Sequence, residues 1–300
     1  MTAEAPDARG VAETAETAEV AETAGPDALA RLREELVRLG RVVVAFSGGA
    51  DSAFLAKVAH DTLGPDRVLC ATAVSPSLAP EEEDDCRLLA REWGLRWVGV
   101  PTDEMSDPGY VANGPDRCAR CKSALMSALL PLAVDEGATV VLGVNVDDLD
   151  DHRPGQQAAA QQGARFPLVT ARFTKDQVRE WSRRLGLRTW DKPAAACLAS
   201  RLPYGTPVEI GTLRSVARAE SAVRALGFGQ LRVRHHGDVA RLEVDAAELP
   251  EVLGRRHEVV SAVRSAGYRF VTLDLEGFRS GSLNRALAGT GPVAGDGRSG

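Results

Sequence analysis

Six consecutive residues, Ser47-Gly48-Gly49-Ala50-Asp51-Ser52, combine two glycines with two hydroxyl groups and one carboxylate. The glycines allow backbone N–H groups to approach an anion closely, and a following helix adds the positive end of its dipole. Ser47 and Ser52 offer hydroxyl donors to phosphate oxygens. An aspartate beside phosphates is explained by a bound Mg²⁺ ion or by a helix cap. The segment predicts a phosphate-binding loop, and an ordinary glycine-rich turn is the alternative.

Three of the five cysteines stand in contexts that suit thiol chemistry. Cys118 and Cys121 form a C-x-x-C pair flanked by basic residues, and Cys197 lies in the segment Ala-Cys-Leu-Ala-Ser-Arg. A pair by itself fits a redox couple, half of a zinc site or two ligands of an iron–sulfur cluster. Three thiolates on one cluster would leave one iron open to a substrate or a sulfide. We interpret Cys70 and Cys86 as buried structural residues, and a purely structural Cys197 is the alternative reading.

Further polar residues suggest ligand contacts. Asn145 follows an expected strand, together with four aspartates, and carboxylates there either hold Mg²⁺ or begin a solvated helix. The aspartates are Asp147, Asp148, Asp150 and Asp151. Ser200 and Arg201 follow Cys197 by three and four residues and suit a transferring phosphate. Arg232 and Arg234 alternate on one strand face, a pattern more typical of a solvated surface.

The elements that must position these residues alternate between strand and helix up to about residue 205. We expect strands at 41–46, 67–74, 96–101 and 139–145, and helices at 28–39, 54–64, 81–93 and 119–135. Buried strands that alternate with helices predict an α/β fold with a doubly wound parallel sheet, in which ligands bind beyond the carboxyl ends of the strands. Beyond residue 205, short strands around helices at 214–226 and 250–266 predict a smaller α+β domain.

Composition and charge limit the classes of function. The chain has 300 residues, 44% of them hydrophobic and 26% charged, which is enough for a substantial core. Residues 1–27 hold seven of the 42 acidic residues and one of the 36 basic ones, so the remainder is neutral overall. A neutral folded part disfavours a nucleic-acid partner. The sequence contains no apolar run of membrane-spanning length and no secretory signal, so we expect a cytoplasmic protein with no membrane partner.

The expected organisation has four parts. Residues 1–26 form a low-complexity tail, 27–205 the phosphate-binding domain, 206–287 the small domain and 288–300 a second tail. Both tails are expected to be disordered because they cannot bury enough apolar surface. The sequence indicates no function for the Ala/Glu/Thr-rich first tail.

The loop resembles the SGGxDS motif of the pyrophosphatase-loop (PP-loop) enzymes, which adenylate a substrate oxygen and release pyrophosphate. With it, in order, come RCARCK (117–122), GVNVDDLDDHRPG (143–155), TKDQVREW (174–181), WDKPAAACLASRLPYG (190–205) and LDLEGFRSGSLN (273–284). Together these motifs resemble the LarE family of ATP-dependent pyridinium-3,5-biscarboxylic acid mononucleotide sulfurtransferases, over roughly residues 28–285. The resemblance implies that the chain converts a carboxylate of that nucleotide to a thiocarboxylate, during synthesis of the nickel-pincer nucleotide cofactor.

The resemblance also implies cofactors and site residues. ATP would bind at Ser47, Gly48, Gly49, Asp51, Ser52, Asn145, Ser200 and Arg201, with Mg²⁺ at Asp51. In one class of the family, a single cysteine at the position of Cys197 gives up its sulfur. In the other class, this cysteine and a C-x-x-C pair hold a [4Fe–4S] cluster whose open iron carries the sulfur. Cys118, Cys121 and Cys197 match the second class.

The same resemblance extends to partners. Glu220, Arg232 and Arg234 would bind the phosphate of the pyridinium mononucleotide at a site formed between subunits. The chain would be a homo-oligomer, a hexamer as in the family, and the sequence leaves open which source supplies sulfide. Two alternatives remain at this stage: a PP-loop enzyme that thiolates tRNA, which needs a basic surface, and a regulatory module that binds ATP without catalysis.

Overall fold

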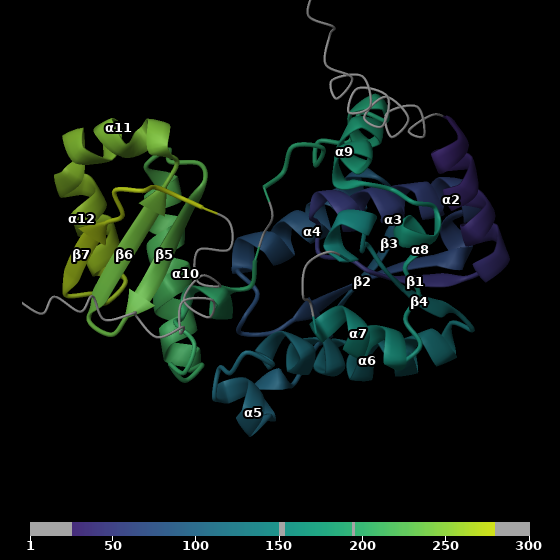
Figure 1. Cartoon of the computed structure of the whole chain (residues 1–300), viewed down its shortest axis with the longest axis horizontal. Helices are drawn as coiled ribbons and strands as arrows, with labels where there is room; N and C mark the ends of the chain where they lie inside the picture. The colour runs from purple at the N-terminus through teal and green to yellow at the C-terminus, as the bar shows by residue number, and fades with distance from the viewer. Residues whose placement is uncertain (1–25, 150–153, 194–195, 280–300) are drawn as a thin grey trace, which may run out of the picture. The chain divides into compact units, whose positions relative to one another are not determined.

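The computed structural model describes residues 26–149, 154–193 and 196–279. Both expected tails, except Pro26, lie outside these residues, as do Asp150 and Asp151. The chain divides into two compact units (Figure 1). The first contains the segments Met1–Val74, Glu81–Thr102 and Cys118–Ala195, and the second contains Ser75–Pro80, Asp103–Arg117 and Ala196–Gly300. No helix in the described part of the chain is long and apolar enough to cross a membrane.

The first unit is built on a four-stranded parallel sheet with the strand order β3-β2-β1-β4. The strands are β1 (Val42–Ala45), β2 (Val68–Val74), β3 (Arg96–Pro101) and β4 (Thr139–Leu142). The helices are α2 (Pro26–Leu39), α3 (Ala50–Leu63), α4 (Pro80–Glu92), α6 (Arg117–Asp135), α7 (Pro154–Gln161), α8 (Pro167–Thr170) and α9 (Lys175–Arg184), with 3₁₀ turns η1 (Pro65–Arg67) and η3 (Val146–Leu149). The predicted α/β class with a parallel sheet is confirmed.

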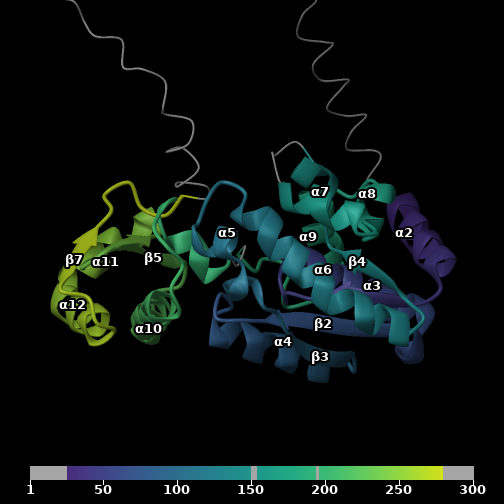
Figure 2. The same ribbon diagram turned by 90° about the horizontal axis from the view of Figure 1, so that it is seen from below.

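Helices cover both faces of this sheet, as Figures 1 and 2 show. Side chains alternate across a strand, so Val42 and Val44 of β1 enter one core while Val43 enters the other. The first core is closed by α2, α3, α4, α8 and α9, and the second by α6 and α7. A strand buried on both faces reads as a continuous apolar run, and Val42–Ala45 is such a run.

The strand expected at 139–145 ends earlier, at Leu142. The reason lies at Gly143, where a Cβ atom would stand 2.8 Å from the backbone nitrogen of Ser52. At this glycine the chain after β4 passes directly against the beginning of α3. That approach brings the residues following β4 to the predicted phosphate loop.

The second unit has a three-stranded sheet in the order β5-β6-β7, antiparallel between β5 and β6 and parallel between β6 and β7. Its elements are α5 (Pro108–Val111), α10 (Ile210–Ala225), β5 (Leu231–His236), β6 (Val239–Val244), α11 (Leu249–Gly254), α12 (Arg256–Ser265) and β7 (Phe270–Leu273), with 3₁₀ turns η2 (Glu104–Ser106), η4 (Leu198–Arg201) and η5 (Ala246–Glu248). Side chains of α10, α11 and α12 share one core with those of β5 and β6. This arrangement matches the expected small α+β domain.

The two units meet in sequence at Ala195 and Ala196, whereas the sequence suggests a boundary near residue 205. The physical reason is that the residues around Cys197 bond to the second unit. The N–H group of Leu198 donates to the carbonyl oxygen of Ser77 (2.8 Å), and Arg201 forms an ion pair with Glu220. Cys197 therefore belongs to the second unit, and the predicted phosphate loop belongs to the first.

The helix α9 begins with a complete capping box, as its sequence Thr-Lys-Asp-Gln suggests. Thr174 Oγ1 accepts a hydrogen bond from the N–H of Gln177, and Gln177 Oε1 accepts one from the N–H of Thr174. Each bond satisfies a backbone donor that the first turn of a helix leaves without an intrahelical partner.

We predict that Thr174→Ala lowers the free energy of unfolding by about 1 kcal/mol because it removes this cap. The matched control is Thr62→Ala, since the Thr62 hydroxyl only donates back to the Val58 carbonyl inside α3. Alanine has the higher helix propensity there, so the control should be neutral or slightly stabilising. Urea unfolding followed by circular dichroism measures both, and equal effects of the two substitutions would contradict the assigned role of the cap.

Candidate active site

The predicted phosphate loop follows β1, at the point where the order of the strands reverses. From β1 the chain continues to β2 and β3 on one side, and it later returns to β4 on the other side of β1. In open α/β sheets, ligands bind outside the carboxyl ends of the strands at this switch point. The loop after β1 and Asn145 after β4 both occupy this edge.

The loop is held by hydrogen bonds between its two serines. Ser52 Oγ accepts from the N–H of Ser47 (3.2 Å), lies 3.0 Å from Ser47 Oγ, and donates to the carbonyl of Gly49. Gly48 has a φ of +67°, which L-residues rarely adopt, and Gly49 is the N-cap of α3 without a side-chain cap. The first turn of α3 therefore keeps backbone N–H groups for an anion, as the sequence predicts for a phosphate loop.

Asp51 is tied to the neighbouring strand end. Its Oδ1 accepts a hydrogen bond from Nδ2 of Asn145 (2.9 Å), and Asn145 is completely buried. Burial raises the pKa of Asp51 above its ordinary value, although the Asn145 hydrogen bond and the charge of Lys175 act in the opposite direction. A partly buried carboxylate beside a phosphate loop is stabilised by a bound cation, which is compatible with the predicted Mg²⁺ role.

The aspartates after Asn145 have defined structural partners. Asp148 Oδ2 accepts from the N–H of Asn145 (3.2 Å), and Asp147 Oδ2 accepts from the N–H of Lys175 (2.7 Å). These bonds connect the segment after β4 to the start of α9. They also bring Lys175 near Asp51, a role that the sequence does not indicate because the segment has the pattern of a capping box.

A second lysine, Lys192, lies beside the loop and was also missed. A Cβ atom at Gly48 would stand 2.9 Å from Cys86 Sγ and 3.7 Å from Lys192 Nζ. Lys192 Nζ bonds to Glu82 (2.8 Å) and Asp85 (2.7 Å) of α4, and although burial acts against the charge, these carboxylates keep the pKa of Lys192 above its ordinary value. These two ion pairs fix Lys192, which precedes Cys197 in sequence, to α4 of the first unit.

The C-x-x-C pair occupies the first turn and a half of α6. Cys118 is exposed and Cys121 is partly buried, and a spacing of three residues puts both on one helix face. The neighbouring helix α7 approaches closely at Gly155, where a Cβ atom would stand 2.8 Å from the carbonyl oxygen of Cys118. Within the residues described here, no three His, Cys, Asp or Glu side chains form a group that could hold a metal ion.

Cys197 is the second residue of the short turn of residues 196–201, which we call the cysteine turn. Four of its carbonyl oxygens accept hydrogen bonds from buried guanidinium groups. Arg201 donates to Ala196 (2.5 Å) and Cys197 (3.0 Å), Arg117 donates to Ala199 (2.9 Å), and Arg234 donates to Ser200 (2.9 Å). The hydroxyl of Ser200 also donates to the Cys197 carbonyl (2.7 Å). The backbone that carries the thiol is thus fixed on several sides.

Arg201 is fully engaged within the second unit. Its Nε and Nη2 donate to the two carboxylate oxygens of Glu220, at 2.8 and 3.0 Å, while Nη1 donates to carbonyl oxygens of the cysteine turn. Glu220 is 1% exposed and also accepts from Arg224 and from the N–H of Val233, so each of its oxygens has two donors. Burial opposes ionisation of Glu220, but its ion pair with Arg201 keeps the pKa below the ordinary value.

Arg232 and Arg234 are buried, so the solvated strand face that their spacing favoured is wrong for both. Arg234 forms a bidentate ion pair with Glu243 on β6, at 3.0 and 2.9 Å. The guanidinium of Arg232 lies 5.1 Å from the ring centre of Phe278, and burial together with the nearby Arg201 lowers its pKa to about 10. Glu243 was missed because it lies on the neighbouring strand, where it is in register with Arg232 and bonds to Arg234 diagonally.

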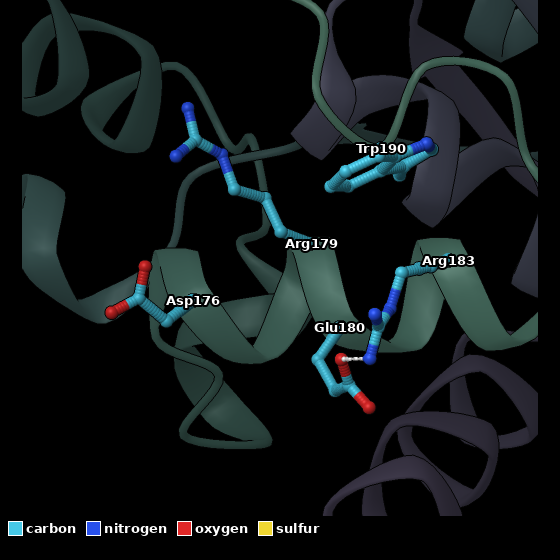
Figure 3. A pocket seen from close by; sticks show the side chains of 5 residues that line it. All are labelled: Asp176, Arg179, Glu180, Arg183 and Trp190. Carbon is cyan, nitrogen blue, oxygen red and sulfur yellow. Dashed lines mark hydrogen bonds and ion pairs between the residues drawn. The ribbon is translucent and has the colours of Figure 1, made fainter.

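The predicted residues therefore fall into two groups. Ser47, Gly48, Gly49, Asp51, Ser52 and Asn145 come together in the first unit, where Cys118 and Cys121 also lie. Cys197, Ser200, Arg201, Glu220, Arg232 and Arg234 come together in the second. A shallow pocket of about 290 Å³ on α9 belongs to neither group; Asp176, Arg179, Glu180, Arg183 and Trp190 line it (Figure 3).

The five thiols should differ sharply in reactivity. Burial raises the pKa of Cys70 to about 12 and of Cys86 to about 11, whereas Cys118, Cys121 and Cys197 are all at least partly accessible. We predict that iodoacetamide at pH 8 alkylates the latter three in the metal-free native protein and spares the former two. Peptide mass mapping measures this, with denatured protein as the control in which all five react; alkylation of native Cys86 as fast as Cys118 would contradict the assignment.

Glu220→Gln should destabilise the protein by about 3 kcal/mol at neutral pH, because it leaves the charge of Arg201 buried without its counter-ion. Since the folded-state pKa of Glu220 is depressed, its contribution is present above the unfolded-state value and is lost as the pH falls through the folded-state value. The difference from wild type should therefore shrink on acidification. Urea unfolding across this pH range tests it, with the exposed Glu258→Gln as a control without measurable effect.

Comparisons with known proteins give the same assignment as the motifs. No family model matches the chain. It is 45% identical over 262 residues to an uncharacterised protein of Synechocystis sp., covering 86% of this chain and 97% of that protein. It is 40% identical over 259 residues to the pyridinium-3,5-bisthiocarboxylic acid mononucleotide synthase of Lactiplantibacillus plantarum, covering 86% and 94%. A shorter stretch of 70 residues, 23% of this chain and 25% of the relative, is 36% identical to the NH₃-dependent NAD⁺ synthetase of Chlorobium phaeobacteroides.

The similarity to the Lactiplantibacillus plantarum synthase extends over nearly the whole of both chains. In addition, this chain has a parallel α/β sheet with a glycine-rich loop at its switch point. The family expected from the ordered motifs is confirmed. The chain belongs to the LarE family, the pyridinium-3,5-bisthiocarboxylic acid mononucleotide synthases.

Proposed function

We propose that this protein is an ATP-dependent sulfurtransferase that converts carboxylates of pyridinium-3,5-biscarboxylic acid mononucleotide to thiocarboxylates, in the synthesis of the nickel-pincer nucleotide cofactor. The observation that carries this proposal is the 40% identity to the named synthase over 94% of its length. The geometry supports it independently, because an anion-binding loop and an accessible cysteine on a fixed turn are the two parts that such a reaction needs.

In the first step, a substrate carboxylate oxygen attacks the α-phosphorus of ATP, an acyl adenylate forms, and pyrophosphate leaves. The N–H groups at the start of α3, with Ser47 and Ser52, bind and stabilise the leaving pyrophosphate. Asp51 would hold Mg²⁺, and Asn145 orients the Asp51 carboxylate through its hydrogen bond. Lys175 adds positive charge on the same side of Asp51.

In the second step, sulfur replaces AMP at the activated carbon. The cysteine turn presents Cys197, and Ser200 holds the turn by its hydrogen bond to the Cys197 carbonyl rather than by a bond to phosphate. Arg201 and Glu220 are engaged with each other, so we assign both to the support of this turn. Arg234 is paired with Glu243 and bonded to the Ser200 carbonyl, so we assign it to the support of the turn as well. Arg232 remains the proposed phosphate contact of the nucleotide, in a homo-oligomer whose hexameric state follows from the family resemblance.

The cysteines allow two sources for the transferred sulfur. Cys118, Cys121 and Cys197 fit an iron–sulfur cluster in donor type, since all three are thiols with some solvent access and two share one helix turn. A [4Fe–4S] cluster held by these three residues would supply an open iron for an exogenous sulfide. Without it, Cys197 would donate its own sulfur once and become dehydroalanine.

Two competing functions make different predictions. A tRNA thiolase needs salt-dependent binding to phosphates, which the neutral charge of residues 28–300 disfavours. A regulatory ATP-binding module would leave Cys197 without a role in chemistry. A gel shift with tRNA tests the first, and formation of thiocarboxylate by a Cys197→Ser protein would exclude both enzymatic uses of this thiol. The cytoplasmic location stays a prediction from the sequence.

The proposed reaction is tested with the purified protein, MgATP and the pyridinium biscarboxylate mononucleotide under anaerobic conditions. We expect substrate-dependent release of pyrophosphate and a product in which sulfur replaces oxygen. Asp51→Asn should lower pyrophosphate release by about 100-fold or more, because it removes the carboxylate that binds the metal ion. Cys197→Ser should release pyrophosphate and form no thiocarboxylate.

The matched control for Asp51→Asn is Asp61→Asn, which lies on the same helix and pairs only with the neighbouring Lys57 at the surface. Full pyrophosphate release by Asp51→Asn would refute the assignment of the loop. After sulfide-supported turnover, about four irons per chain with unchanged protein mass supports the cluster. Loss of one sulfur and two hydrogens from Cys197, with no iron bound, would establish the sacrificial route.

A further inference from the structure

Two segments of the second unit that are distant in sequence hold the cysteine turn. They are Ser75–Pro80 and Asp103–Arg117. The N–H of Leu198, the residue after Cys197, donates to the carbonyl oxygen of Ser77 (2.8 Å). Ser77 Oγ lies 2.5 Å from the hydroxyl oxygen of Tyr110, and both residues are buried. This hydrogen bond therefore joins the two segments at the residue that accepts from Leu198.

Asn113 holds the chain that follows the cysteine turn. It is completely buried and comes directly after the C-cap of α5, with a φ of +56°, a left-handed conformation that asparagine adopts more readily than most residues. Its Nδ2 donates to the carbonyl oxygens of Pro203 (2.9 Å) and Thr206 (2.8 Å). Its own backbone carbonyl accepts from the N–H of Gly205 (3.1 Å).

The amide oxygen of Asn113 completes the network toward the turn itself. Oδ1 accepts from Nη1 of Arg117 (2.5 Å), and the same Nη1 donates to the carbonyl oxygen of Ala199 (2.9 Å). Both amide protons and the amide oxygen of Asn113 are therefore used, on three different segments of the same unit. Aspartate has the same shape but no donor, so it cannot make the two bonds to Pro203 and Thr206.

We propose that Asn113 is a positioning residue for the sulfur-transfer step, because its amide sets the conformation of the turn that presents Cys197. The inference rests on the proposed function and deepens it by assigning Asn113 to one of the two steps. The hydrogen bonds of Asn113 lie within the second unit, whereas the phosphate loop belongs to the first. A displacement of a reacting atom by about 1 Å can cost about 100-fold in rate. Loss of these bonds should therefore slow sulfur transfer and leave adenylation intact.

The first measurement separates the two steps in a single turnover with MgATP and the pyridinium biscarboxylate mononucleotide. Asn113→Asp removes two donors at nearly constant volume and keeps a residue that tolerates a positive φ. We expect thiocarboxylate formation to fall between about 10- and 100-fold while pyrophosphate release stays as in wild type. Tyr110→Phe removes only the bond to Ser77 and should show a smaller loss in the same direction, so it remains informative where Asn113→Asp fails to fold.

The second measurement is independent of activity. Hydrogen exchange, followed by mass spectrometry on the metal-free full-length protein, reports how tightly residues 198–208 are held. Their amides should exchange about five- to tenfold faster in Asn113→Asp, since the loss of buried hydrogen bonds favours local opening. The amides of α12 in the same unit should exchange as in wild type, which distinguishes local loosening from unfolding of the domain.

The matched control is Tyr268→Phe, which removes another buried tyrosine hydroxyl of the second unit, one that lies 3.2 Å from Nδ1 of His235. It should match wild type in thiocarboxylate formation and in exchange at residues 198–208. Undiminished thiocarboxylate formation by Asn113→Asp, an equal loss of both steps, or unchanged exchange at residues 198–208 would each overturn the inference.

Failure of the proposed function has a different signature. A wild-type protein that forms no thiocarboxylate contradicts the proposed function, and exchange alone then decides the role of Asn113. Faster exchange at residues 198–208 in Asn113→Asp supports its hold on the cysteine turn, and unchanged exchange refutes it.

Discussion

Hydrogen bonds from three buried guanidinium groups to the carbonyl oxygens of residues 196–201 fix the backbone that carries Cys197. Burying a charge is costly unless it is paired and bonded. The pairing is provided for Arg201 by Glu220 and for Arg234 by Glu243, while Arg117 bonds to the amide oxygen of Asn113. Glu220 is on α10 and Glu243 on β6, so the second unit must fold as a whole before the cysteine turn acquires its shape. The α+β domain therefore stabilises the conformation of the cysteine turn.

In the first unit, the corresponding constraint is close backbone approach. Gly48 adopts a left-handed conformation above Cys86, and Gly143 brings the chain after β4 directly against Ser52. The hydrogen bond between Asn145 and Asp51 depends on that approach. The anion-binding edge is therefore produced by small residues at two strand ends, and the side chains that complete it come from α3 and the start of α9.

The sequence predicted those parts whose signals are local. Alternating apolar runs indicated the parallel sheet, and the order of motifs indicated the family. It did not predict the burial of Arg232 and Arg234 or the ion pairs of Arg201 and Arg234, because spacing alone cannot distinguish a solvated arginine from one buried opposite a glutamate on another element. Arg201 meets Glu220 across 19 residues and Arg117 meets Ala199 across 82, distances at which a single sequence carries no pattern. Asn113 had no signal at all beyond its place near the C-x-x-C pair.

The arginines bind carbonyl oxygens of the cysteine turn. This arrangement is compatible with both proposed sulfur chemistries. A guanidinium bonded directly to the thiolate of Cys197 would stabilise that sulfur and compete with any iron or acyl carbon. Bonds to the peptide oxygens restrict the backbone and leave the sulfur orbitals available. The conformation of the turn is therefore compatible with either proposed use of Cys197, as a metal ligand or as a sulfur donor. The two proposed chemistries are distinguished by whether Cys118 and Cys121 on α6 take part.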